Sequence, residues 1–203
     1  MTRSDLLRYA RVHRAAGILG GTLVVALLSA YAGGTRIGLP FGDGLTTGIP
    51  FRRDLPLLSA VFLTAAFGGE AAAHEEMGGP ALHRLRAAYV GILVVTVCAF
   101  SFAVEALAVG PGLGVVFVRS LLIWFGLATL SVAAFGPRLG WALPLASAFP
   151  LVWSGPAWWD WTVAPATDPY SWTVAALASA AGAAASAATP WRRRALLRRR
   201  RPR

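Results

Sequence analysis

The sequence predicts an all-α membrane protein with six transmembrane helices and both termini in the cytoplasm. Three observations support this fold class. Hydrophobic residues make up 56% of the 203 residues, and the mean hydropathy is +0.59. They come in blocks long enough to cross a bilayer, which takes roughly 20 residues per helix. The arginines, in contrast, gather between the blocks and at the two ends of the chain.

The apolar blocks place six helices in one transmembrane domain, residues 15–190. The fifth block contains Pro144 and Pro150, so we expect a kinked or partly re-entrant helix there. In the sixth, Ala178, Gly182 and Ser186 recur every four residues, which favours close packing against a neighbouring helix. The predicted spans are residues 15–34, 55–73, 87–109, 115–136, 138–154 and 171–188.

The N-terminal residues 1–14 have the pattern of an amphipathic helix in the membrane interface, with Ser4 as its cap and Asp5 in its first turn. Its apolar side comprises Leu6, Leu7, Tyr9 and Ala10, and its basic side Arg8, Arg11 and Arg14. The arginines, the apolar run and Ala30-Tyr31-Ala32 also imitate a cleavable signal peptide. Because five further spans follow, we expect the first helix to be retained.

The arginines determine the predicted orientation. If both termini are cytoplasmic, 15 of the 19 arginines lie inside, on the termini and on the loops before the third and fifth helices. The Arg-rich tail, residues 191–203, is then a cytoplasmic anchor for anionic lipids rather than a nucleic-acid arm. The chain contains no lysine, and its Ala, Gly and Arg usage is typical of a high-GC bacterium. We therefore expect it in a bacterial plasma membrane.

The cytoplasmic gap between the second and third helices, about residues 70–86, is unusually charged. Gly78 and Gly79 break one helix and Pro80 opens the next, so the gap forms an elbow of two short helical protrusions. Such an elbow is suited to docking a soluble partner, although solvated charges that cap helix ends would give the same pattern. The candidate docking residues are Glu70, His74, Glu75, Glu76, His83, Arg84 and Arg86.

A metal site in this gap is disfavoured. His74, Glu75 and Glu76 resemble the start of the zinc motif HExxH, but the second histidine is replaced by Gly78. His74 and His83 with Glu70 could collect a metal ion, yet a solvated loop offers no closed cage of ligands.

Two charges lie inside the predicted membrane domain. Glu105 and Arg119 each stand seven residues from Gly112 in a tight turn, so they lie at equal depth and could face each other. Ionisable groups there are costly unless they are paired or face a cavity. The sequence leaves open a structural ion pair and a polar site on a translocation path. In the external loop, residues 155–170, turn and cap roles account for Asp160 and Asp168 as well as a substrate role does.

Three stretches resemble ABC-2 type permeases, the membrane subunits of ABC exporters. These are GGPALHRLR before the third helix, VRSLLIWFGLATLSVAAFGPRLGWALP in the fourth and fifth, and WDWTVAPATDPYSW before the sixth. The resemblance covers about the C-terminal two thirds of the chain and includes no catalytic signature. The first external loop, residues 35–54, matches nothing in that pattern.

The resemblance implies a permease that forms its pathway with a second permease and couples through residues 70–86 to a separate ABC ATPase. The chain has no P-loop, so ATP and Mg²⁺ would bind on that partner, and this chain would be neither an enzyme nor a cofactor carrier. The alternative is a non-transporting membrane scaffold or immunity protein. An intramembrane enzyme is disfavoured, because the sequence contains no nucleophile elbow and no paired intramembrane aspartates.

Overall fold

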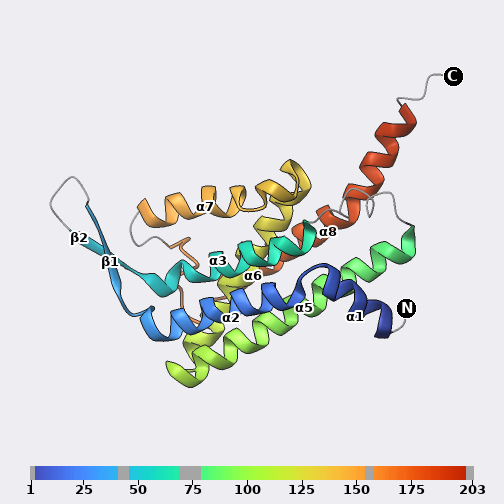
Figure 1. Cartoon of the computed structure of the whole chain (residues 1–203). Coiled ribbons are helices and arrows are strands. Elements are labelled where there is room, and N and C mark those ends of the chain that lie inside the picture. The colour runs from blue at the N-terminus through green and yellow to red at the C-terminus, as the bar shows by residue number, and fades with distance from the viewer. Residues whose placement is uncertain (1–2, 41–45, 69–78, 154–157, 200–203) are drawn as a thin grey trace.

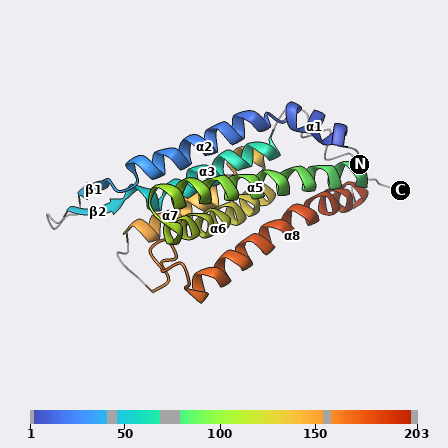
Figure 2. The same ribbon diagram turned by 90° about the horizontal axis from the view of Figure 1, so that it is seen from below.

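The computed structural model describes residues 3–40, 46–68, 79–153 and 158–199. It is an elongated helical bundle with a β-hairpin at one end and both chain termini at the other (Figure 1). We call these the hairpin end and the terminus end. A view turned by 90° places the hairpin and the termini at the same two ends (Figure 2).

The chain runs through the bundle in the following order. A short helix α1 (Arg3–Val12) precedes α2 (Ala15–Ala32), and the hairpin β1 (Arg36–Pro40) and β2 (Thr46–Pro50) follows. Next come the 3₁₀ turn η1 (Phe51–Arg53), α3 (Leu55–Thr64) and a second 3₁₀ turn, η2 (Ala65–Phe67). The remaining elements are α5 (Pro80–Ala108), α6 (Pro111–Phe135), η3 (Pro137–Leu139), α7 (Ala142–Trp153) and α8 (Pro169–Arg199).

Four helices in the described part of the chain are long and apolar enough to cross a membrane: Ala15–Ala32, Pro80–Ala108, Pro111–Phe135 and Pro169–Ala188. The chain is therefore a membrane protein, as the sequence predicted. In the other two predicted spans, 55–73 and 138–154, the described residues form only short helices, and residues 69–73 and 154 lie outside the described residues. α3 with η2 and α7 contain 13 and 12 residues, about 20 and 18 Å of helix, against a hydrocarbon core of about 30 Å. Pro150 lies inside α7.

The predicted all-α fold holds except for the hairpin. β1 and β2 pair antiparallel, with Arg36 opposite Pro50 and Ile37 opposite Ile49. This hairpin occupies the first predicted external loop, residues 35–54. Backbone pairing between the two strands satisfies their polar groups without a helix.

Helix α6 forms the centre of the bundle and packs against α3, α5, α7 and α8. Its Leu121, Trp124 and Ala128 are fully buried. Pro111 occupies the first turn of α6, where a missing N–H costs no hydrogen bond. Gly136 ends α6 with a φ of 91°, a backbone conformation that favours glycine.

Helices α8 and α6 pack so closely that their backbones are in contact. A Cβ added at Gly126 would lie 2.4 Å from the carbonyl carbon of Ala178, and one at Gly182 would lie 2.8 Å from the carbonyl oxygen of Gly126. The predicted close packing of the small-residue face is therefore confirmed at Ala178 and Gly182. Ser186, one turn further, is exposed. Gly→Ala changes at this contact would push the two helices apart.

Candidate functional site

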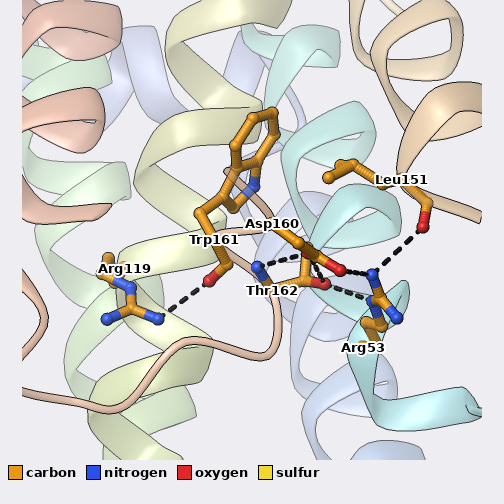
Figure 3. A network of polar contacts seen from close by, with 6 residues as sticks. All are labelled: Arg53, Arg119, Leu151, Asp160, Trp161 and Thr162. Atoms are coloured by element: carbon orange, nitrogen blue, oxygen red, sulfur yellow. Dashed lines mark hydrogen bonds and ion pairs between the residues drawn. The ribbon is translucent and has the colours of Figure 1, made fainter. Parts of the chain in front are cut away.

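The hairpin end contains a network of buried charged and polar groups (Figure 3). Arg53, in η1, forms an ion pair with Asp160 and donates hydrogen bonds to the Thr162 hydroxyl and, over 3.1 Å, to the Leu151 carbonyl. Asp160 accepts hydrogen bonds from the Thr162 amide at 3.0 Å and the Thr162 hydroxyl at 2.6 Å. Burial lowers the pKa of the Arg53 guanidinium, and neighbouring Asp54 opposes this change. The network joins η1, α7 and the segment 158–168.

Arg119, in α6, binds the same segment from the other side. Its guanidinium donates to the carbonyl oxygens of Trp161 at 2.8 Å, Ala164 at 2.7 Å and Pro165; Figure 3 shows the first of these bonds. The side chain is fully buried. Three carbonyl dipoles thus take the place that a carboxylate would have in an ion pair, and a single side chain fixes the segment to the central helix.

The predicted ion pair between Glu105 and Arg119 is wrong. Glu105 is fully buried in α5 and pairs with Arg52 of η1, whose Nε lies 3.2 Å from Oε2. Equal distance from the turn fixes the depth of two residues but not the direction each faces around its helix. The buried residues of α5 recur every four positions down to Glu105, and α5 packs against α2, which ends beside η1.

Arg52 links η1 to α2 and α5, but its guanidinium does not use all of its hydrogen-bond donors. Its Nη2 donates to the Ser29 carbonyl of α2 over 3.0 Å. Its Nε, although close to Glu105, is not aligned for a hydrogen bond, and both carboxylate oxygens of Glu105 lack a hydrogen-bond donor among the described residues. Arg52 and Arg53 belong to the first predicted external loop, residues 35–54, on the side with few arginines. This unusual position was the feature of the sequence that could have indicated buried acidic partners.

A cavity of about 520 Å³ opens between η1, the first turns of α6 and the segment 158–168. Its walls are mostly apolar, and Arg52, Arg53, Ser120 and Thr162 contribute the polar side chains. The lining residues are Gly33, Gly34, Arg52, Arg53, Pro56, Gly112, Leu113, Val116, Phe117, Ser120, Thr162, Val163, Ala164, Pro165 and Ala166.

Asp160 and Asp168 have the structural roles considered from the sequence. Asp160 forms a turn with the Thr162 amide. Asp168 caps α8 by accepting from the Ser171 amide at 2.8 Å and from the Ser171 hydroxyl. These hydrogen bonds lower the pKa of the Asp168 carboxyl, since they favour its charged form.

The predicted docking residues are only partly within the described chain. Glu70, His74, Glu75 and Glu76 lie outside the described residues. His83, Arg84 and Arg86 lie in the first two turns of α5, where Arg84 is exposed and the other two are half-buried. The Arg86 guanidinium lies 5.3 Å from the centre of the Phe67 ring, a cation–π contact. His83 Nε2 is buried without a hydrogen bond to any described residue.

Helix α1 is fixed beside these residues by an aromatic cluster. Tyr9 stacks on His13 with ring centres 4.0 Å apart and meets the edge of Tyr89 of α5 at 5.2 Å. The Tyr89 hydroxyl donates to the His13 carbonyl over 3.3 Å. Arg14 has a φ of 53° and separates helix α1 from helix α2. Of the predicted apolar side, Tyr9 is buried, Leu6 and Ala10 are half-buried and Leu7 is 61% exposed.

No family of proteins can be assigned to the chain by comparison. No protein-family model, curated protein or solved structure matches it. Within the described ranges, no group of three or more His, Cys, Asp or Glu side chains is placed to hold a metal ion.

Proposed function

We propose that the chain is the membrane-embedded permease subunit of an ATP-driven exporter and couples at its terminus end to a separate ABC ATPase. In this proposal the terminus end faces the cytoplasm of a bacterium and a second permease copy completes the pathway. ATP and Mg²⁺ bind on the ATPase. The resemblance of three sequence stretches to ABC-2 permeases is the starting point, and the geometry of α5 is the observation that carries the proposal.

Helix α5 is longer than a membrane span requires. Its 29 residues give about 44 Å of helix, against a hydrocarbon core of about 30 Å. The excess fits its polar N-terminal turns, PALHRLR, which include His83, Arg84 and Arg86. The second half of the predicted elbow is thus continuous with a membrane span. A force applied to these turns by a partner would reach the span without crossing a hinge.

The contacts around these turns also fit a coupling role. Helix α1 is attached to α5 at Tyr89, about one turn beyond Arg86. Arg86 contacts Phe67, at the end of η2. A displacement of the first turns of α5 would therefore also move the N-terminal helix and the end of α3. Arg84 remains exposed and is available to an acidic surface on a partner.

The proposal predicts that an ATPase co-purifies with the tagged protein in mild detergent and that Arg84 contributes to its binding. We expect Arg84→Glu to weaken the association roughly tenfold, about 1.4 kcal/mol, because it places like charges in contact. The matched control is Arg138→Glu, which reverses another exposed arginine at the terminus end but outside the elbow. It should leave the association unchanged.

Quantitative mass spectrometry of the purified complexes measures both variants. Absence of any stoichiometric ATPase would contradict the permease function and favour a non-transporting scaffold. If the wild-type protein and both variants bind an ATPase equally, the permease function stands, but Arg84 has no part in the coupling.

A further inference from the structure

The cavity at the hairpin end presents a cationic surface. Of the described residues that line it, the charged ones are Arg52 and Arg53. Their acidic partners, Glu105 and Asp160, are not among the lining residues. A ligand in the cavity would therefore meet the guanidinium groups and not the carboxylates that balance them.

Arg52 retains hydrogen-bonding capacity toward a ligand. One nitrogen, Nη2, is bonded to the Ser29 carbonyl, and Nε is close to Glu105 but poorly aligned with it. Nη1 makes no hydrogen bond to any residue in the described part of the chain. A guanidinium with a free edge is a preferred donor to phosphate and carboxylate oxygens.

The first turn of α6 adds a second source of positive potential. Gly112 and Leu113 of this turn line the cavity, and Gly110, which precedes the helix, supplies no side-chain cap. The first N–H groups of a helix have no acceptor within it, and in a helix of 25 residues they form the positive end of a substantial dipole. Anions bind readily at such an end.

A serine side chain lines the cavity deeper on the same face of α6. Gly112, Val116 and Ser120 follow at four-residue intervals, so the cavity extends about 12 Å along the helix. Ser120 is only 2% exposed and lines the cavity. Its hydroxyl is therefore placed to bond a polar atom of a ligand that reaches this depth.

We propose that this cavity binds a phosphate-bearing amphiphile. Its phosphate lies at Arg52 and the first turn of α6, and its apolar part lies along Leu113, Val116 and Phe117. The cavity lies where the candidate span α2 ends and the candidate span α6 begins. The ends of membrane spans lie near the lipid headgroups. The site does not depend on the proposed transport function, because neither an ATPase nor a second permease contributes to it.

The test is lipid binding to the purified full-length protein after delipidation in neutral detergent. Native mass spectrometry measures the affinity for phosphatidylglycerol and for diacylglycerol, which has the same tails but no phosphate. We expect phosphatidylglycerol to bind at least about tenfold more tightly. Inorganic phosphate at millimolar concentration distinguishes the sources: displacement of the lipid supports a site that the phosphate alone can fill, and no displacement supports one that needs the acyl chains.

Two cavity-filling variants leave the Arg52–Glu105 pair intact. A Cβ at Gly112 or at Gly34 would meet no atom within 4 Å, and both residues line the cavity. We expect Gly112→Leu and Gly34→Leu each to weaken phosphatidylglycerol binding about tenfold, because the leucine occupies the ligand's volume. Using two variants from different elements protects the test against misfolding of one. The matched control is Gly91→Leu in α5, a helical glycine with equally open surroundings outside the cavity.

The control should bind phosphatidylglycerol as the wild-type protein does. Equal affinity for phosphatidylglycerol and diacylglycerol would overturn the proposal. Equal losses of phosphatidylglycerol affinity in the folded cavity variants and in Gly91→Leu would also overturn the proposal. The lipid would then bind to the membrane-facing surface in general and not in the cavity.

Discussion

The two ends of the bundle hold their arginines in opposite ways. At the hairpin end, Arg119 is fully buried and Arg53 nearly so, and both donate to the segment 158–168. At the terminus end, Arg84 and Arg138 are exposed, and Arg86 lies half-buried on an aromatic ring. Arg53 and Arg119 therefore fix a loop, whereas Arg84 and Arg138 remain available to headgroups or a partner.

The difference shows that the number of arginines at each end of the bundle does not reveal what each arginine does. The orientation rule does not explain the arginines of the hairpin end, which the sequence predicts to lie at the external side. Arg53 and Arg119 instead donate to buried acceptors, the carboxylate of Asp160 and three backbone carbonyls. The terminus end has many arginines, and individual ones there should be replaceable with small effects on folding.

Replacing Arg119 should cause the largest loss of stability. Arg119→Leu removes three hydrogen bonds and leaves the carbonyl oxygens of Trp161, Ala164 and Pro165 without their donor. We expect a loss of about 2–4 kcal/mol in unfolding free energy. We also expect faster proteolysis of the segment 158–168. Thermal unfolding in detergent and limited proteolysis measure the two effects. Arg138→Leu, at the terminus end, is the control and should change neither.

The same variant tests the corrected partner of Glu105. Since Glu105 pairs with Arg52 and not with Arg119, the losses from Arg119→Leu and Glu105→Gln should add to within about 0.5 kcal/mol in the double variant. If the double variant is more stable than Arg119→Leu alone, the result would support the Glu105–Arg119 ion pair predicted from the sequence.

Much of the fold was accessible from the sequence, because bilayer spans depend on local composition. The long apolar helices and the contact of α8 through Ala178 and Gly182 were predicted in this way. The prolines of α7 also indicated an irregular fifth helix, whereas the hairpin, the short length of α3 and the partner of Glu105 were not predicted. They depend on how distant segments meet: Arg53 and Asp160, for example, are 107 residues apart in sequence.

The Arg53–Asp160 pair should show a measurable coupling within the hairpin end. A double-mutant cycle with Arg53→Ala and Asp160→Ala is expected to give an interaction energy of about 1–3 kcal/mol, because both side chains are largely buried and share Thr162. Unfolding of the two single variants and the double variant supplies the cycle. A coupling close to zero would show that the segment 158–168 is held by Arg119 alone.

The smallest effect is expected at the terminus end. Tyr89→Phe removes the hydroxyl that donates to the His13 carbonyl over 3.3 Å but keeps the ring contact with Tyr9. The bond is long and the ring contacts of Tyr89 remain, so the loss in stability should be below about 1 kcal/mol. The local consequence is larger: α1 should be cleaved faster at its junction with α2, near Arg14. N-terminal sequencing after limited proteolysis measures this, with Gly91→Ala, elsewhere on α5, as the control. A global loss as large as that of Arg119→Leu would instead mean that the terminus end contributes to global stability as strongly as the hairpin end.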